Sequence, residues 1–360
     1  MNTKPLRVDR IVVVTPMMAG ADGISEMTRQ WVRALEARVG RDVGSLEVWS
    51  LDDARAPAFT TTAVRFQTAH GGRLRFGSFA ARDGIASAAG TVVVVMHVQL
   101  LPVALPLVWR GARLLPVLMG IEAWVPLPSM QSRALQQAWK VAAISAHTAT
   151  RFRETNPSAG GIDITVCRPG VPLLEQPCSQ RIAGPYALIV GRMNSRERYK
   201  GHDALIDMWP HVRRTVPGAR LVIAGDGDDA PRLRGKAGEG IEFTGCVDRT
   251  RLAALYRDAA FFVMPSPEEG FGLVYLEAMS AATPCIAAPG AAEEIITHGR
   301  DGLIVDAADG ESLLEAMLRL FVDHELRSRM GAAAAQRVAV EFDASAVERR
   351  VRKVLELEEA

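Results

Sequence analysis

The chain has 360 residues, of which 48% are hydrophobic and 23% are charged, and its formal net charge at pH 7 is +1. This length exceeds what one hydrophobic core ordinarily supports, so we expect two domains. The near-neutral balance excludes a protein whose overall charge would direct it to nucleic acid. The first residues, MNTKPLRVDR, lack the apolar stretch and the cleavage site of a signal peptide, and we expect a cytoplasmic protein.

The first half of the chain alternates between short apolar runs and helical patterns. Runs that are apolar at successive positions are typical of parallel strands buried on both faces. Five such runs occur, at 10–15, 46–52, 91–97, 114–120 and 141–146. The most apolar region, 91–120, is interrupted by prolines and arginines, so we expect a strand, a helix and a strand there rather than a membrane span.

A second alternation follows a proline-containing segment near residue 178. Its predicted strands lie at 186–191, 220–225, 241–245, 260–265, 284–289 and 302–306, and its predicted helices lie at 201–215, 249–258, 272–282, 309–322 and 323–342. A last amphipathic helix is predicted at 344–357. The pattern indicates two doubly wound α/β domains, 1–178 and 179–343, facing each other across a cleft.

The charge is unevenly divided between these halves. Residues 1–178 carry 19 basic and 13 acidic residues, a balance of +6, whereas the remainder carries −5. This difference is either scatter or the sign of an anionic ligand or surface, including a peripheral membrane contact, on the N-terminal side.

The stretch PEEGFGLVYLEAM, residues 267–279, follows a predicted strand and runs into a predicted helix. Gly270 and Gly272 allow a ligand to approach the backbone, and the helix start offers unpaired N–H groups and a partial positive charge. This arrangement binds anions, diphosphates in particular. Glu277 is placed to bind ribose hydroxyls, and Glu269 precedes the helix. Acidic residues also favour helix N-termini without any ligand, but that does not explain the glycine pair.

A second stretch, GRMNSRERYKGHD, follows the predicted strand 186–191. Arg192 and Lys200 supply positive charge for the same anion, although a solvated basic loop is the simpler alternative. After the first strand, Gly23 lies in a turn that lacks the dinucleotide fingerprint, and no P-loop or serine-nucleophile elbow occurs in the chain.

The metal-ligating residue types form no convincing site. The four cysteines fit no zinc spacing, so we expect small buried residues, and the Asp226-Gly227-Asp228 cluster is more typical of a turn than of a metal site. In the first half, His97 and Glu122 follow buried strands and are candidates to face the cleft, although His97 is nearly as well explained as a core histidine.

Together, GRM…ERYKGHD and PSPEEGFGLVYLEAM resemble the large family 4 of retaining glycosyltransferases, also called glycosyl transferases group 1, which have the GT-B fold. The segments ADGISEM, MGIEAWVPLP and EEIITHGRDGLIVD fall in the order of that family. The resemblance implies a nucleoside-diphosphate sugar held mainly by the second domain, a glycan or lipid-linked acceptor held mainly by the first, and a last helix that packs back onto the first domain. It implies neither a metal ion nor a cofactor.

The resemblance also implies residue roles. Glu269, Arg192 and Lys200 would be catalytic and would contact the donor. Further donor contacts would come from Gly23, Val247, Gly270, Phe271, Gly272, Leu273 and Glu277. Transfer with retention would follow either a covalent intermediate or same-face attack, which the family favours, with the leaving phosphate accepting the acceptor's proton.

Three positions depart from the family pattern. Met119 stands where many relatives have histidine, Asp22 replaces the first glycine of the turn that keeps Gly23, and Ala282 replaces a glycine, which we expect to affect packing only. The first two leave open a non-catalytic nucleotide-sugar-binding subunit, and a nucleotide-sugar epimerase of the same fold is a further alternative.

Overall fold

The structure is a computed structural model that describes residues 8–82, 88–159, 161–172, 184–306 and 308–357. The chain divides into two compact units, residues 1–170 with 344–360 and residues 171–343. The predicted boundary between residues 178 and 179, together with Cys178, lies outside the described residues.

The first unit is built on a seven-stranded parallel sheet with the order β3-β2-β1-β4-β5-β6-β7. Its strands are β1 (Val8–Thr15), β2 (Val43–Ser50), β3 (Val64–Thr68), β4 (Thr91–Val95), β5 (Arg113–Leu118), β6 (Val141–Ala143) and β7 (Ile164–Val166). Five of these strands match the predicted apolar runs. The sequence analysis missed β3, which is mostly exposed or half-buried, and β7, which has three residues, because neither forms a long apolar run.

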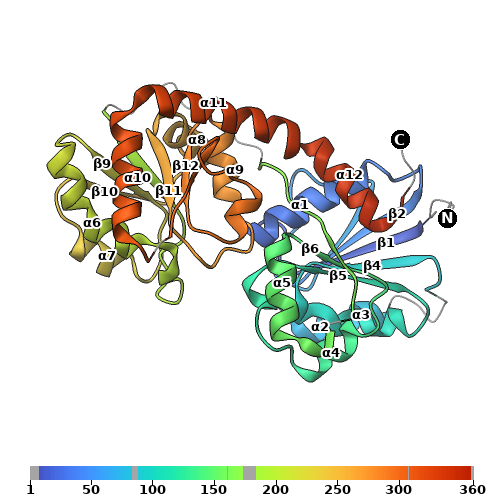
Figure 1. Cartoon of the computed structure of the whole chain (residues 1–360). Helices are drawn as coiled ribbons and strands as arrows, with labels where there is room; N and C mark the ends of the chain where they lie inside the picture. Colours follow the sequence, from blue (N-terminus) through green and yellow to red (C-terminus); the bar gives the residue numbers. More distant parts are fainter. Residues whose placement is uncertain (1–7, 83–87, 160, 173–183, 307, 358–360) are drawn as a thin grey trace. The chain divides into compact units, whose positions relative to one another are not determined.

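Helices cover both faces of this sheet (Figure 1). They are α1 (Gly23–Glu36), α2 (Arg73–Arg82), α3 (Leu101–Val108), α4 (Ser129–Leu135), α5 (Ala146–Thr155) and α12 (Ala344–Leu355), with short 3₁₀ turns η1 (Val98–Leu100), η2 (Ile121–Ala123) and η3 (Pro157–Ala159). The helix α12 contacts α1, whereas α2 contacts α3 and α3 contacts α4.

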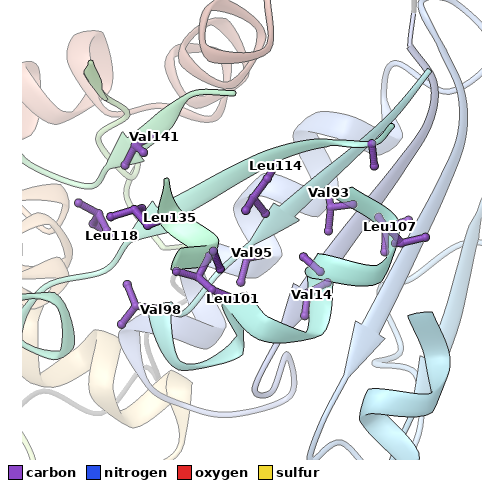
Figure 2. Close-up of a cluster of buried hydrophobic side chains, with 14 of the residues drawn as sticks. Val14, Val93, Val95, Val98, Leu101, Leu107, Leu114, Leu118, Leu135 and Val141 are labelled. Carbon is purple, nitrogen blue, oxygen red and sulfur yellow. The ribbon is translucent and has the colours of Figure 1, made fainter. Parts of the chain in front are cut away.

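The core of the first unit is apolar and centred on the most buried strands. All five residues of β4 are buried, and Figure 2 shows Val93 and Val95 with Leu101 and Leu107 of α3 in one cluster. The region 91–120 is therefore a strand, a helix and a strand, as predicted. None of the helices in the described part of the chain has the length together with the apolar content that crossing a bilayer requires.

The second unit carries a six-stranded parallel sheet with the order β10-β9-β8-β11-β12-β13. Its strands are β8 (Tyr186–Val190), β9 (Arg220–Ala224), β10 (Ile241–Gly245), β11 (Phe261–Met264), β12 (Cys285–Ala287) and β13 (Gly302–Ile304). Its helices are α6 (His202–Thr215), α7 (Ala230–Lys236), α8 (Arg249–Asp258), α9 (Leu273–Ser280), α10 (Gly310–Val322) and α11 (His324–Glu341), with 3₁₀ turns η4 (Arg198–Lys200) and η5 (Ala291–Glu294). All six predicted strands and all five predicted helices are present, and α7 is additional.

The free cysteines of the described chain differ in burial. Cys167 and Cys285 are buried, as expected, but Cys246 is exposed. The expectation was wrong for Cys246 because this residue lies in the loop that follows β10, the edge strand of its sheet.

The end of α9 shows that the departure at Ala282 concerns the backbone and not packing alone. Ala282 follows the C-cap residue of this helix and has φ +59°, the left-handed conformation that glycine adopts most readily. A left-handed alanine is strained by roughly 1–2 kcal/mol.

We expect Ala282→Gly to stabilise the protein by about 0.5–1 kcal/mol, because relief of this strain exceeds the backbone entropy that glycine adds to the unfolded chain. The same change at Ala332, which is exposed inside α11, should destabilise by about 0.5–1 kcal/mol. Thermal unfolding of both variants measures the two shifts, and a decrease in melting temperature for Ala282→Gly would contradict the strain argument.

Candidate functional site

The sheet order of the second unit defines where a ligand site is expected. Strand β8 pairs with β9 on one side and with β11 on the other, so the direction of winding reverses between β8 and β11. The loops that leave two such strands diverge, and ligands of open α/β sheets bind beyond the carboxyl ends of the strands at this point. The two sequence motifs, 191–203 and 267–279, contain those two loops and the starts of the helices α6 and α9 that follow them.

The two loops are joined by an ion pair between Lys200 and Glu269. Lys200 Nζ lies 3.0 Å from Glu269 Oε1, which also accepts a hydrogen bond from Ser266 Oγ at 3.0 Å. The two charged side chains are only 13% and 15% exposed. Glu269 Oε2 makes no hydrogen bond within the described residues, and an ammonium group has three donors, so both partners can bind further groups.

One glycine permits this close approach of the loops, and a second shapes the start of α9. Gly201 has φ +85°, and a Cβ atom there would lie 2.6 Å from Pro265 Cγ of the neighbouring loop. Gly272 has φ +95°, and a Cβ atom there would lie 2.4 Å from the ring of Tyr275. A side chain at either position would therefore be strained and would also displace its neighbour.

The helix α9 begins directly after Gly272, and no side chain caps its N-terminus. The N–H of Tyr275 donates to Gly272 O at 3.0 Å, and the N–H groups at the start of the helix carry the positive end of its dipole. Phe271 is buried beside Phe342, with 6.1 Å between ring centroids, and the Tyr275 hydroxyl donates to Met264 O at 2.7 Å. These contacts anchor the segment that includes Gly270 and Leu273, so its backbone is pre-organised for an anion.

Glu277 is held by a residue that the sequence analysis did not identify. The hydroxyl of Tyr256, on α8, donates to Glu277 Oε2 at 2.7 Å. Burial raises the pKa of Tyr256 well above its ordinary value, and the Glu277 charge raises it further, so the hydroxyl remains a donor. No local motif marks Tyr256 or Ser266, because their roles arise only when α8, α9 and β11 are packed together.

Neither Arg192 nor Val247 joins the ion pair between Lys200 and Glu269. The side chain of Arg192 is 67% exposed, and its guanidinium binds Glu197 at 2.7 Å. Val247 is half-buried in the loop after β10, immediately before Asp248, which caps α8. Asp228 accepts hydrogen bonds from the N–H and hydroxyl of Ser195, which tie the 226–228 cluster to the loop after β8.

His202 is an unexpected buried group at the start of α6. It is 3% exposed, and its Nε2 has no hydrogen-bond partner among the described residues. Burial, assisted by the charge of Lys200, lowers the pKa of His202 to about 4, so the imidazole is neutral at pH 7.

In the first unit, Gly23 is the first residue of α1, and Asp22 is turned towards this helix. The Asp22 carboxylate accepts the N–H of Ser25 at 3.0 Å and its hydroxyl at 2.9 Å, as an N-cap does. The preceding loop is held by the buried Asp53, which accepts the N–H groups of Met18 and Ala19 at 2.7 and 2.9 Å. The Asp22 carboxylate is therefore already hydrogen-bonded to the first turn of α1.

His97 and Glu122 follow the neighbouring strands β4 and β5, but no hydrogen bond or ion pair of the described residues joins them. His97 Nδ1 accepts the N–H of Gln99 at 3.2 Å, and burial lowers the His97 pKa, so the neutral ring carries its proton on Nε2. Glu122 accepts the N–H of Met119 at 2.7 Å, and burial raises its pKa. His97 therefore offers an N–H donor at Nε2, and Glu122 offers a carboxyl group that is oriented by the turn in which it lies.

The sheet topology and the second-unit site together define a doubly wound α/β protein with a candidate anion site at a topological switch point. Residues 184–323 match the family model of the glycosyl transferases group 1. The resemblance found in the sequence is thereby confirmed, and the second unit carries the domain of that family.

The comparisons with curated proteins give relatives that share part of their length with this chain. A GDP-mannose-dependent alpha-(1-6)-phosphatidylinositol monomannoside mannosyltransferase of Mycobacterium tuberculosis is 35% identical over 156 residues, 40% of each chain. A GDP-mannose-dependent monoacylated alpha-(1-6)-phosphatidylinositol monomannoside mannosyltransferase of Corynebacterium glutamicum is 30% identical over 234 residues, covering 60% of this chain and 61% of the other. The chain thus spans less than two thirds of the length of these relatives.

The comparison with solved structures confirms the GT-B fold over nearly the whole chain. Sucrose-phosphate synthase from Thermosynechococcus elongatus has a TM-score of 0.76 at 21% identity, covering 96% of this chain and 98% of the other. Anabaena HepE, solved in complex with UDP and glucose, has a TM-score of 0.74 at 17% identity, covering 96% and 99%.

The buried His202 predicts a pH dependence of stability. Its folded pKa of about 4 lies below the ordinary value of 6.5. As the pH falls from about 6.5 towards 4, the unfolded chain binds a proton that the folded chain does not, so stability falls, by about 2 kcal/mol near pH 5.

His202→Gln should reduce the loss of melting temperature between about pH 7.5 and pH 5, whereas His211→Gln, at an exposed position of the same helix, should leave that loss unchanged. An equal pH dependence in the wild type and in His202→Gln would contradict the assignment.

Proposed function

We propose that this protein is a retaining glycosyltransferase that moves a hexose from a nucleoside-diphosphate sugar to a glycan or lipid-linked acceptor. The observation that carries the proposal is the Lys200–Glu269 pair, which lies beside the start of α9 at the switch point of a group 1 glycosyltransferase domain. This arrangement combines a cation, an uncapped helix N-terminus and a carboxylate that retains one oxygen for a ligand.

In this proposal the leaving group is a nucleoside diphosphate. The bond between the anomeric carbon and the β-phosphate oxygen breaks, and the developing negative charge needs donors that are already in place. Lys200, with only 13% of its side chain exposed, and the N–H groups at Leu273 and its neighbours are such donors. The exposed Arg192 would contact the same phosphates after breaking its ion pair with Glu197. The proposed mechanism uses neither a metal ion nor a cofactor.

The sugar carries the complementary charge. As its bond to phosphate lengthens, the anomeric carbon becomes oxocarbenium-like, as in glycoside hydrolysis. Glu269 would orient the sugar through Oε2 and stabilise this charge. The acceptor hydroxyl then attacks the anomeric carbon from the face that the phosphate leaves, and its proton passes to the leaving phosphate oxygen. Each bond broken is balanced by one formed, and the configuration is retained.

The donor and acceptor classes are proposed from the relatives. Their names make GDP-mannose the first donor to test and a phosphatidylinositol mannoside the first acceptor, and UDP is the nucleotide in the Anabaena complex. An acceptor carried by lipid would place the protein at the cytoplasmic face of a membrane. Peripheral contact through the basic N-terminal half, at +6, is part of this proposal.

Donor binding is tested by thermal shift with UDP-, GDP-, ADP- and TDP-sugars on the full chain. A ligand at about 100 times its dissociation constant adds about 2.7 kcal/mol of stability. We expect one nucleotide to raise the melting temperature, Lys200→Ala to weaken this shift, and Lys353→Ala, at an exposed lysine of the first unit, to preserve it. A full shift in Lys200→Ala would contradict the phosphate role.

Transfer is then measured with the nucleotide-sugar that binds. Glu269→Gln should lower kcat by about 10²-fold, because removal of one pre-organised charge has an effect of this size. Donor binding without turnover on any acceptor would favour a binding subunit, and conversion of the donor sugar without an acceptor would favour an epimerase.

The ribose role of Glu277 is tested through Tyr256, which holds it. Tyr256→Phe should raise the Kd of the nucleoside diphosphate about three- to tenfold, since one hydrogen bond to a charged group is lost, and leave the Kd of inorganic diphosphate unchanged. Tyr186→Phe removes a hydroxyl that binds Leu255 O instead and should leave both affinities unchanged. Equal losses for both ligands with Tyr256→Phe would assign Glu277 another role.

A further inference from the structure

The first unit contains a basic pocket that the proposed donor site does not use. It has a volume of about 350 Å³ and lies between the edge strand β3 and the helix α2. Both the strand and the helix escaped the sequence analysis. We propose that this pocket binds a phosphate ester carried by a small polyol, either as a free metabolite or as the headgroup of a lipid.

The helix α2 directs a single stripe of side chains into the pocket. Arg75, Phe79 and Arg82 line it and are spaced four and three residues apart, so they lie on the same face of the helix. Phe79 is buried and packs edge-on against Trp49, with ring centroids 5.9 Å apart, which holds this face towards the sheet. The two arginines therefore flank an apolar floor one turn to either side.

The strand supplies the opposite wall. Arg65 and His70 line the pocket, and no carboxylate is among the described residues that do so. Arg65 is 69% exposed and lies 3.3 Å from Glu47, which is also bound by Arg10 at 2.9 Å, so one carboxylate is shared by two arginines. Within the described residues, Arg75 forms no ion pair. Three guanidinium groups thus border one cavity with little compensating negative charge.

The turn that closes the pocket is conformationally strained. His70 has φ +49°, a left-handed conformation that is uncommon outside glycine, and Gly71 follows with φ +78°. The His70 N–H donates to Thr68 Oγ1 at 3.1 Å, which fixes the turn. Strain of this kind persists where the surroundings over-determine it and is concentrated at ligand sites. Here the turn reverses the chain after β3, so that α2 runs back along β3 and His70 lines the pocket.

The chemistry of the lining selects the ligand class. Guanidinium groups match phosphate oxygens with two parallel hydrogen bonds, and converging arginines repel one another unless an anion lies between them. The size of the cavity leaves room for a polyol next to the phosphate, and Gln67 offers an amide to its hydroxyls. A neutral glycan would not need three guanidinium groups.

The test uses the full chain with sn-glycerol 3-phosphate as the probe and glycerol as its neutral counterpart, with binding measured by isothermal titration calorimetry. We expect saturable binding of the phosphate ester and none of glycerol. The double variant Arg75→Gln/Arg82→Gln should raise the Kd by about tenfold or more. Arg41→Gln, which removes an exposed arginine of the same unit, should change it by less than about twofold.

Vesicles distinguish the two sources of the phosphate. Phosphatidylcholine vesicles with and without phosphatidic acid are sedimented with the protein. Binding to the anionic vesicles that glycerol 3-phosphate competes away, and that the double variant loses, assigns the pocket to a lipid headgroup. Saturable binding of the ester without vesicle binding assigns it to a free phosphate ester.

The proposal is overturned if the ester does not bind, or if the double variant and Arg41→Gln bind it equally. The nucleotide-induced thermal shift is measured on the same variants and should be unchanged, because the pocket and Lys200 belong to different units. A nucleotide shift without ester binding therefore rejects the pocket alone, and ester binding without a nucleotide shift rejects the donor site alone.

Discussion

The ion pair between Lys200 and Glu269 is the interaction on which the candidate donor site depends. It joins the loops that leave the neighbouring strands β8 and β11, and its two side chains are largely shielded from water. A pair so shielded orients both charges more strongly than a surface pair would. It places a cation beside the start of α9 and leaves Glu269 Oε2 without a hydrogen bond among the described residues, and the proposed donor site is argued from this arrangement.

The backbone around this pair is as constrained as the side chains. Gly201 and Gly272 occupy left-handed conformations in which any side chain would collide with Pro265 or Tyr275. Ala282 shows the cost of the same conformation in a residue other than glycine, at the other end of α9. The short helix that presents its N-terminus to the site is thus bounded at both ends by left-handed residues, which determine where its N–H groups point.

The first unit uses different means to shape its strand ends. Asp53 and the N-cap Asp22 order the loop before α1, and turns with the half-buried His97 and Glu122 follow the adjacent strands. Its basic character is concentrated in part at the edge of the sheet, where arginines from a strand and a helix converge on one cavity. The balance of +6 over residues 1–178 produces a concentrated positive charge only where these arginines come together.

The sequence by itself determined the two parallel sheets, nearly all elements of the second unit and the two motifs that carry Lys200 and Glu269. These features could be predicted because local periodicity and the placement of glycines indicate buried strands and helix starts. It did not reveal β3, since a mostly half-buried edge strand has no continuous apolar run, nor the roles of Tyr256, Ser266 and His202. Those roles depend on which strands are neighbours and on which side chains are removed from water. Sheet order and burial are properties of the packed chain, so only the tertiary structure decided that residues 69 positions apart form one ion pair and that arginines of β3 and α2 share one pocket.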